Sequence, residues 1–96
     1  MDQSAFEQSC AQQGFEAVEE RQGTPGFTSQ MHSHPFTARI MVTGGEFTIT
    51  RNGAAEVYTA GGNFTMDAGC EHAESFGVDG ATFLAARKHH PAGASA

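Results

Sequence analysis

The sequence has few basic residues, no tryptophan and only one tyrosine. Its 96 residues include 5 Lys and Arg against 11 Asp and Glu, which gives a net charge of −6 at pH 7. Binding to nucleic-acid backbones or to anionic membrane surfaces needs clustered cations, so this shortage argues against both kinds of partner. No apolar run is long enough to span a bilayer. We therefore expect neither a nucleic-acid-binding protein nor a membrane protein.

Cysteine is also scarce, with only Cys10 and Cys70 in the chain. Residues 1–4 carry no basic side chain and no apolar stretch follows them, unlike a secretory signal. Disulfides are rare in the cytoplasm. We therefore expect a cytoplasmic protein with two reduced thiols, and pairing of the two cysteines is the alternative.

Glycine, by contrast, is abundant, with 12 residues spread along the chain. Short alternating segments lie between turn signals about every 8–12 residues, which predicts an all-β sandwich or barrel. Asn52-Gly53 is the strongest hairpin signal, and Gly44-Gly45 is predicted to form another hairpin turn. A further turn is predicted at residues 77–80. The expected strands cover residues 15–21, 27–34, 36–43, 46–50, 54–59, 64–66, 72–76 and 81–87.

At the N-terminus the apolar residues recur with the spacing of a helix instead of the alternation of a strand. Residues 2–13 predict a short helix that Asp2 or Ser4 caps and that Gly14 ends. One helical face carries Ala5, Phe6, Ser9 and Cys10. A loosely ordered N-terminal segment is the competing interpretation.

The length of the chain fits one domain. We expect a helical segment at residues 1–14 and a β-barrel domain at residues 15–88. Residues 89–96 are small and polar and are expected to form a flexible tail.

Histidine supplies the strongest chemical signal. His32 and His34 lie two residues apart, so a strand would place both imidazoles on one face. His72 lies far along the chain, after a glycine bend, and would complete a three-imidazole site if the fold brings it opposite the pair. Imidazole donors suit zinc, iron, nickel or copper better than magnesium or calcium, which prefer oxygen. The alternative is that the three are surface histidines or hydrogen-bonded core histidines.

The surroundings of these histidines resemble the two motifs of the cupin family. In the first motif five residues separate a glycine from His-x-His, and five residues separate Gly26 from His32-Ser33-His34. The second motif contains Gly-x-x-His, which matches Gly69-Cys70-Glu71-His72, and Gly61 stands at its initial glycine. The resemblance covers about residues 26–87 and implies a cupin-type jelly-roll β-barrel whose mouth holds a small polar or anionic ligand. It also implies pairing of two copies as a homodimer through an edge strand.

Three positions depart from the motifs. Arg39 replaces the motif Glu, Asp67 replaces the Pro and Phe76 replaces the Asn. The resemblance therefore implies His32, His34 and His72 as metal ligands but leaves the carboxylate ligand without a match.

Several other residues are candidates for the same site. Glu74 lies two residues after His72 and is predicted to replace the missing Glu as a ligand, general base or hydrogen-bond acceptor. An exposed rim charge is the alternative. Arg39, if it points inward, is expected to bind an anionic substrate beside the metal, and otherwise is a solvated edge residue. Gln30 and Cys70 share the parity of the histidines, but a polar lining residue and an inert buried thiol are the favoured interpretations.

Two function classes follow. One is a metalloenzyme in which a divalent transition metal (zinc, iron, manganese or nickel) has an open coordination position, with dioxygenase, isomerase or lyase chemistry. In that enzyme Glu74 would act as the general base, and Arg39 would bind the anionic group of the substrate. The other is a ligand-binding or sensor barrel without turnover, and a barrel without metal is a third possibility.

Overall fold

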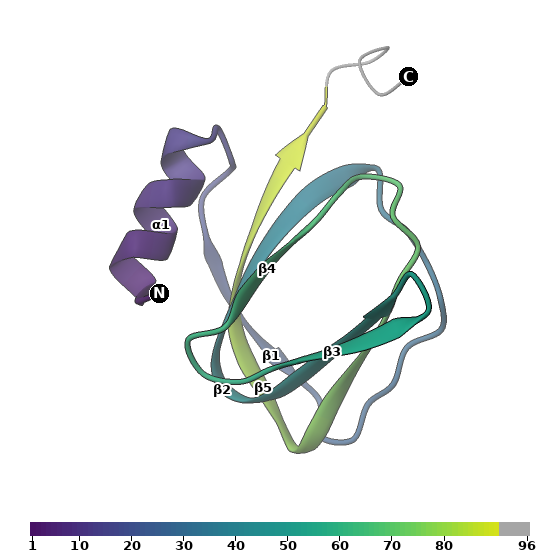
Figure 1. The fold of residues 1–96 in the computed structure, drawn as a ribbon. Helices are drawn as coiled ribbons and strands as arrows, with labels where there is room; N and C mark the ends of the chain where they lie inside the picture. The colour runs from purple at the N-terminus through teal and green to yellow at the C-terminus, as the bar shows by residue number, and fades with distance from the viewer. Residues whose placement is uncertain (91–96) are drawn as a thin grey trace.

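The computed structural model of the chain describes residues 1–90. It confirms an all-β fold with one short N-terminal helix (Figure 1). The elements are α1 (Gln3–Gln12), β1 (Glu19–Gly23), β2 (Phe36–Arg51), β3 (Ala54–Tyr58), β4 (Asn63–Met66) and β5 (Ala73–His89). Among these elements no helix is long and apolar enough to cross a membrane. Strand β5 reaches His89, the first residue of the expected tail, and residues 91–96 of that tail lie outside the described residues.

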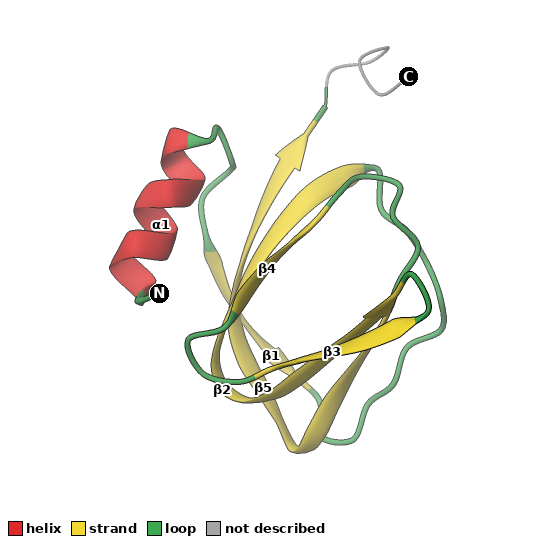
Figure 2. Cartoon of the chain, in the orientation of Figure 1, coloured by secondary structure: helices red, strands yellow, loops and turns green. Residues whose placement is uncertain are grey.

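Two long antiparallel strands, β2 and β5, organise the barrel (Figure 2). The strand order is β1-β5-β2-β3, and β4 also pairs with β2. The first part of β2 lies between β4 and the far part of β5, and its last part lies between β3 and the start of β5. Each long strand therefore contributes to both halves of the barrel.

The predicted hairpin turn at Gly44-Gly45 is wrong. The backbone continues through these glycines as one strand, with register shifts at Val42/Gly44 and Gly45/Phe47. Residues on both sides go on pairing with β5, so the glycines bend β2 instead of reversing it. The predicted turn at residues 77–80 is wrong for the same reason, because β5 runs through it.

The hairpin at Asn52-Gly53 is confirmed, and it joins β2 to β3. Asn52 has φ 54° and Gly53 has φ 75°. Two consecutive positive φ values are characteristic of the type I′ turn that Asn-Gly favours.

The N-terminal helix is confirmed together with both of its caps. The Asp2 side chain accepts a hydrogen bond from the Ala5 N–H at 2.8 Å. At the other end Gly14 has φ 82°, and the Phe15 N–H donates to the Cys10 carbonyl at 2.9 Å. This bond across a left-handed glycine is that of a Schellman motif.

Helix α1 covers the outside of the barrel wall. Its buried residues Phe6 and Cys10 pack with Met41 of β2 and with Leu84 and Ala86 of β5. The inner core contains the residues that alternate with these along the strands. It consists of Ile40, Val42, Phe47, Ile49, Phe64, Met66, Ala81 and Phe83. The middle of β2 is therefore buried on both faces.

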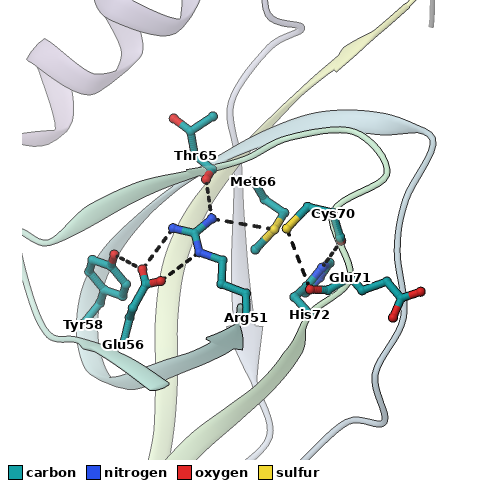
Figure 3. A network of polar contacts seen from close by, with 8 residues as sticks. All are labelled: Arg51, Glu56, Tyr58, Thr65, Met66, Cys70, Glu71 and His72. Carbon is teal, nitrogen blue, oxygen red and sulfur yellow. Dashed lines mark hydrogen bonds and ion pairs between the residues drawn. The ribbon is translucent and has the colours of Figure 1, made fainter. Parts of the chain in front are cut away.

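An ion-pair network fastens the β2–β3 hairpin to β4 (Figure 3). Arg51 donates to both carboxylate oxygens of Glu56 at 2.9 Å, and its Nη1 donates to the Thr65 carbonyl at 2.7 Å. The Tyr58 hydroxyl donates to the same carboxylate at 2.7 Å. Hydrogen bonds from Arg51 and Tyr58 lower the pKa of Glu56 to about 2.

This network predicts a loss of stability in acid. The lowered pKa of Glu56 stabilises the fold above the unfolded pKa near 4.5, and this contribution is lost as pH falls toward 2. Because the carboxylate is partly exposed, we expect the contribution to be about 1 kcal/mol. Urea unfolding at pH 6 should show Glu56→Gln less stable than wild type by that amount, and the gap should close near pH 2.5.

The matched control is Glu20→Gln, which removes an exposed carboxylate on β1. It should show no comparable gap at pH 6. A Glu56→Gln gap that is the same at both pH values would contradict the prediction.

Candidate metal and ligand site

The three histidines meet because two segments far apart in the sequence run side by side. The His32 N–H donates to the His72 carbonyl at 2.8 Å, and the His72 N–H donates back to the His32 carbonyl at 2.9 Å. A residue pair that exchanges both bonds lies directly opposite on the two chains. His34 is two residues further on, so its ring comes to the same face. The predicted convergence of the three imidazoles is confirmed.

The segment that carries His32 and His34 is not the regular strand predicted at residues 27–34. It forms only isolated bridges, Thr28 with Ser75 and His32 with His72. Part of the reason is that the Ser29 hydroxyl accepts the Glu74 N–H at 2.9 Å, where a ladder would use a carbonyl. The segment still runs antiparallel to the start of β5, and that is enough to place the rings.

A tight turn brings the chain into position before His72. The Cys70 N–H donates to the Asp67 carbonyl at 3.1 Å, with Gly69 at φ 80° in the third position. A type II turn needs a positive φ at that position, which glycine supplies. The Gly69 N–H also donates to the His34 carbonyl at 2.9 Å and ties the turn to the histidine segment.

In the three-His cluster (His32, His34 and His72), the imidazole nitrogens lie close together, and hydrogen bonds orient two of the rings. One ligand nitrogen from each residue lies within 4.8 Å of the others. Nδ1 of His32 lies 2.7 Å from the Gln30 carbonyl, and Nδ1 of His72 lies 3.0 Å from the Cys70 carbonyl (Figure 3 shows the second). A carbonyl only accepts hydrogen bonds, so each Nδ1 carries the proton. The lone pair of each Nε2 is therefore left for a metal.

The surroundings of His34 favour its neutral imidazole. Burial lowers the pKa of His34 most, and the neighbouring His32 and His72 lower it further. A metal ligand must be unprotonated. The environment of His34 thus favours the form that binds metal.

Glu74 lies beside the cluster, as its position two residues after His72 predicted. Its Oε1 is 3.7 Å from His32 Nε2, and its side chain is 29% exposed. Glu74 and His72 line the same cavity. The site therefore has a carboxylate, although it comes from a different part of the chain than the cupin motif Glu.

Gln30 and Cys70 contribute mainly through their backbones. Each carbonyl accepts the Nδ1–H of a clustered histidine, while the Gln30 side chain is exposed. The Cys70 thiol is not part of the three-His cluster and donates to the Glu71 carbonyl at 3.7 Å. Neither favoured interpretation holds in full, because the Gln30 side chain is exposed instead of lining the cavity and the Cys70 thiol is only partly buried.

Arg39 does not lie beside the three histidines, so its predicted inward position is wrong, and with 7% exposure it is not the solvated edge residue of the alternative either. Its guanidinium points to the outer face of the wall, where Nη1 donates to Ser9 Oγ at 2.7 Å and to Gln13 Oε1 at 3.2 Å. It also lies over the Phe6 ring at 5.1 Å. The physical reason is alternation: Ala38 and Ile40 face the cavity, so Arg39 between them faces α1.

A cavity of about 220 Å³ opens beside the cluster inside the barrel. Most of its lining is apolar, and its polar residues are His34, His72, Glu74, Arg21 and Arg87. Sequence reasoning missed the two arginines. Strand alternation could have identified Arg87, because it lies on the same face of the strand as the cavity residues Phe83 and Ala85.

Comparisons with known proteins agree with this geometry at the level of fold. No family model and no curated protein matches the sequence. An RmlC-like cupin from Shewanella frigidimarina is 20% identical, with a TM-score of 0.67 over 79% of this chain and 68% of that protein. A protein of unknown function from Rhizobium leguminosarum is 15% identical, with a TM-score of 0.71 over 77% of this chain and 70% of that one.

The polyketide cyclase RemF from Streptomyces resistomycificus is similar as well. It is 20% identical, with a TM-score of 0.66 over 78% of this chain, and the chain spans 56% of its length. At these identities the likeness concerns the fold alone. The chain therefore has the fold of a small cupin-type domain.

Proposed function

We propose that the three-His cluster binds one divalent transition metal (zinc, iron, manganese or nickel) and that the adjoining cavity binds a small organic molecule. The observation that carries the proposal is the grouping of three imidazole nitrogens within 4.8 Å. Two of the rings are already oriented by hydrogen bonds from Nδ1 to carbonyls. Second-sphere bonds of this kind fix the tautomer and ring orientation in metal sites.

The donor set fits such a metal. Three imidazoles and one carboxylate are donors that first-row transition metals accept, whereas imidazole nitrogens are poor ligands for calcium. A bound metal would act as a Lewis acid that polarises a ligand oxygen. Glu74 is placed either to coordinate it or to take a proton from a molecule in the cavity, since its carboxylate lines both the cluster and the cavity.

Turnover is the second candidate function, and Glu74 is the observation that favours it over binding alone. A carboxylate at the edge of an apolar cavity is a suitable general base. Turnover is tested by incubating the protein with a panel of small acids and either iron or manganese, and by measuring product formation. Ligand-induced thermal stabilisation without product formation, with every metal supplied, would identify a binding protein instead.

The direct test is the metal content of protein purified without a histidine tag and without added metal. We expect about one equivalent per chain by elemental analysis. Glu74→Gln should retain the metal at saturation but bind it about 10–100-fold more weakly in a chelator competition. Glu71→Gln, a neighbouring exposed carboxylate, is the matched control and should bind like wild type. Failure of the wild type to bind any of the four metals in titrations would refute the proposal.

A further inference from the structure

The cavity has a chemical character that the metal site alone does not explain. Phe36, Ala38 and Ile40 of β2 lie beside Phe83 and Ala85 of the neighbouring β5 in one wall of the cavity, with further apolar side chains around them. Ile40 pairs directly with Ala85, and Ala38 pairs with Arg87. The two alanines leave unfilled the space that larger side chains occupy elsewhere in the core. The cavity is therefore suited to bind the apolar part of a ligand.

The size of the cavity limits that apolar part. An apolar protein cavity of roughly 150 Å³ is large enough to bind benzene. At about 220 Å³ this cavity holds a single ring with a small substituent, but not a fused three-ring system.

Arg87 gives the cavity a positively charged end. Its guanidinium stacks over the Phe36 ring at 4.6 Å, and that ring in turn stacks on His34 with centroids 4.8 Å apart. Within residues 1–90, Arg87 forms no ion pair with a carboxylate, whereas Arg21 is paired with Glu19 at 2.7 Å. A stacked guanidinium with free donors is well suited to bind a carboxylate through two hydrogen bonds.

The charges that line the cavity favour the binding of an anion, although the chain as a whole has a net negative charge. Two of the 5 basic residues in the sequence line this one cavity, and Glu74 is the only carboxylate of a described residue that lines it. Glu74 lies at the histidine end, next to His32, where a bound metal would offset its charge. Arg87 is thus left as the cation available to a ligand.

We infer that the cavity binds a small carboxylic acid with a single-ring apolar body, whose carboxylate is held by Arg87. This inference deepens the proposed function and rests on it only for the metal beside the ligand. It narrows the small polar or anionic ligand expected from the sequence to an anion with an apolar body, and it replaces Arg39 with Arg87 as the anion-binding residue.

Calorimetric titration with benzoate and its neutral isostere benzamide tests the inference, in metal-loaded and in metal-free protein. We expect wild type to prefer benzoate over benzamide by about tenfold or more, as a charge-assisted bidentate pair requires. Arg87→Met should reduce that preference to less than about threefold. Lys88→Met removes the neighbouring cation, which donates to the Gln13 carbonyl away from the cavity, and should keep the full preference. Acetate and anthracene carboxylate should each bind at least about tenfold more weakly than benzoate, since one lacks the ring and the other exceeds the cavity.

The outcomes separate this inference from the proposed function. An Arg87-dependent benzoate preference in metal-free protein supports the inference even if metal analysis rejects the metal site. Metal binding with equal affinity for benzoate and benzamide overturns the inference and leaves the metal site intact. A benzoate preference that survives Arg87→Met overturns it too, because another group then holds the carboxylate. Equal binding of anthracene carboxylate and benzoate would place the ligand outside the cavity and would also overturn it.

Discussion

The double variant His32→Ala/His72→Ala should purify with less than about a tenth of an equivalent of metal, because it keeps one imidazole of three. The reciprocal backbone bonds between these two residues do not involve their side chains, so the segment should stay paired with β5. Loss of two ligands should weaken metal affinity by more than about 100-fold. Elemental analysis and chelator competition measure the two effects separately.

His89→Ala/His90→Ala is the matched control for this experiment. It also removes two histidines, but these lie at the end of β5, where His89 pairs with Glu16 and His90 with Thr37. It should retain wild-type metal. Equal metal loss in both double variants would assign binding to scattered surface histidines and contradict a three-His site. If the buried His72 proves essential for folding, His34→Gln provides the same comparison with a half-buried residue.

The sequence was sufficient to single out the three clustered histidines because local rules set how each ring is presented, although their meeting depends on the long-range pairing of His32 with His72. The two-residue spacing of His32 and His34 sets their common face, and the Gly69 turn sets the approach of His72. The helix was predictable on the same grounds, through the Asp2 cap and Gly14. Each of these features is decided within a few residues of the chain.

Long-range pairing accounts for what the sequence did not reveal. A pair of glycines such as Gly44-Gly45 is compatible with a reversal or with a bulge, and only the pairing of both flanks with β5 decides between them. Alternation turns Arg39 toward α1, where Ser9 of the helix and its C-cap residue Gln13 offer acceptors, a contact across about thirty positions of the chain. The homodimer and the cytoplasmic location stay predictions. In the described part of the chain, β1, β3 and β4 each pair with a single strand and are the edges available for such a dimer.

Gly45→Ala should destabilise the protein by about 2–5 kcal/mol, the sum expected for left-handed strain and overpacking. Gly45 has φ 70°, and a Cβ there would lie 2.2 Å from the Gly80 carbonyl oxygen and 2.9 Å from the Cα of Ala81. Both contacts are with the backbone of β5, which cannot rotate away as a side chain would. Guanidinium unfolding of wild type and variant measures the change in the free energy of unfolding.

Gly53→Ala separates the two causes. Gly53 has nearly the same φ, 75°, but a Cβ there meets nothing within 4 Å. It should therefore cost only the left-handed strain of about 1–2 kcal/mol. Equal losses in the two variants would show that the close approach of β2 and β5 at Gly45 is not a constraint. A larger loss in Gly45→Ala, together with weaker benzoate binding, would show that this bulge sets the cavity as well as the fold, because the part of β2 beyond it supplies Phe47 and Ile49 to the lining.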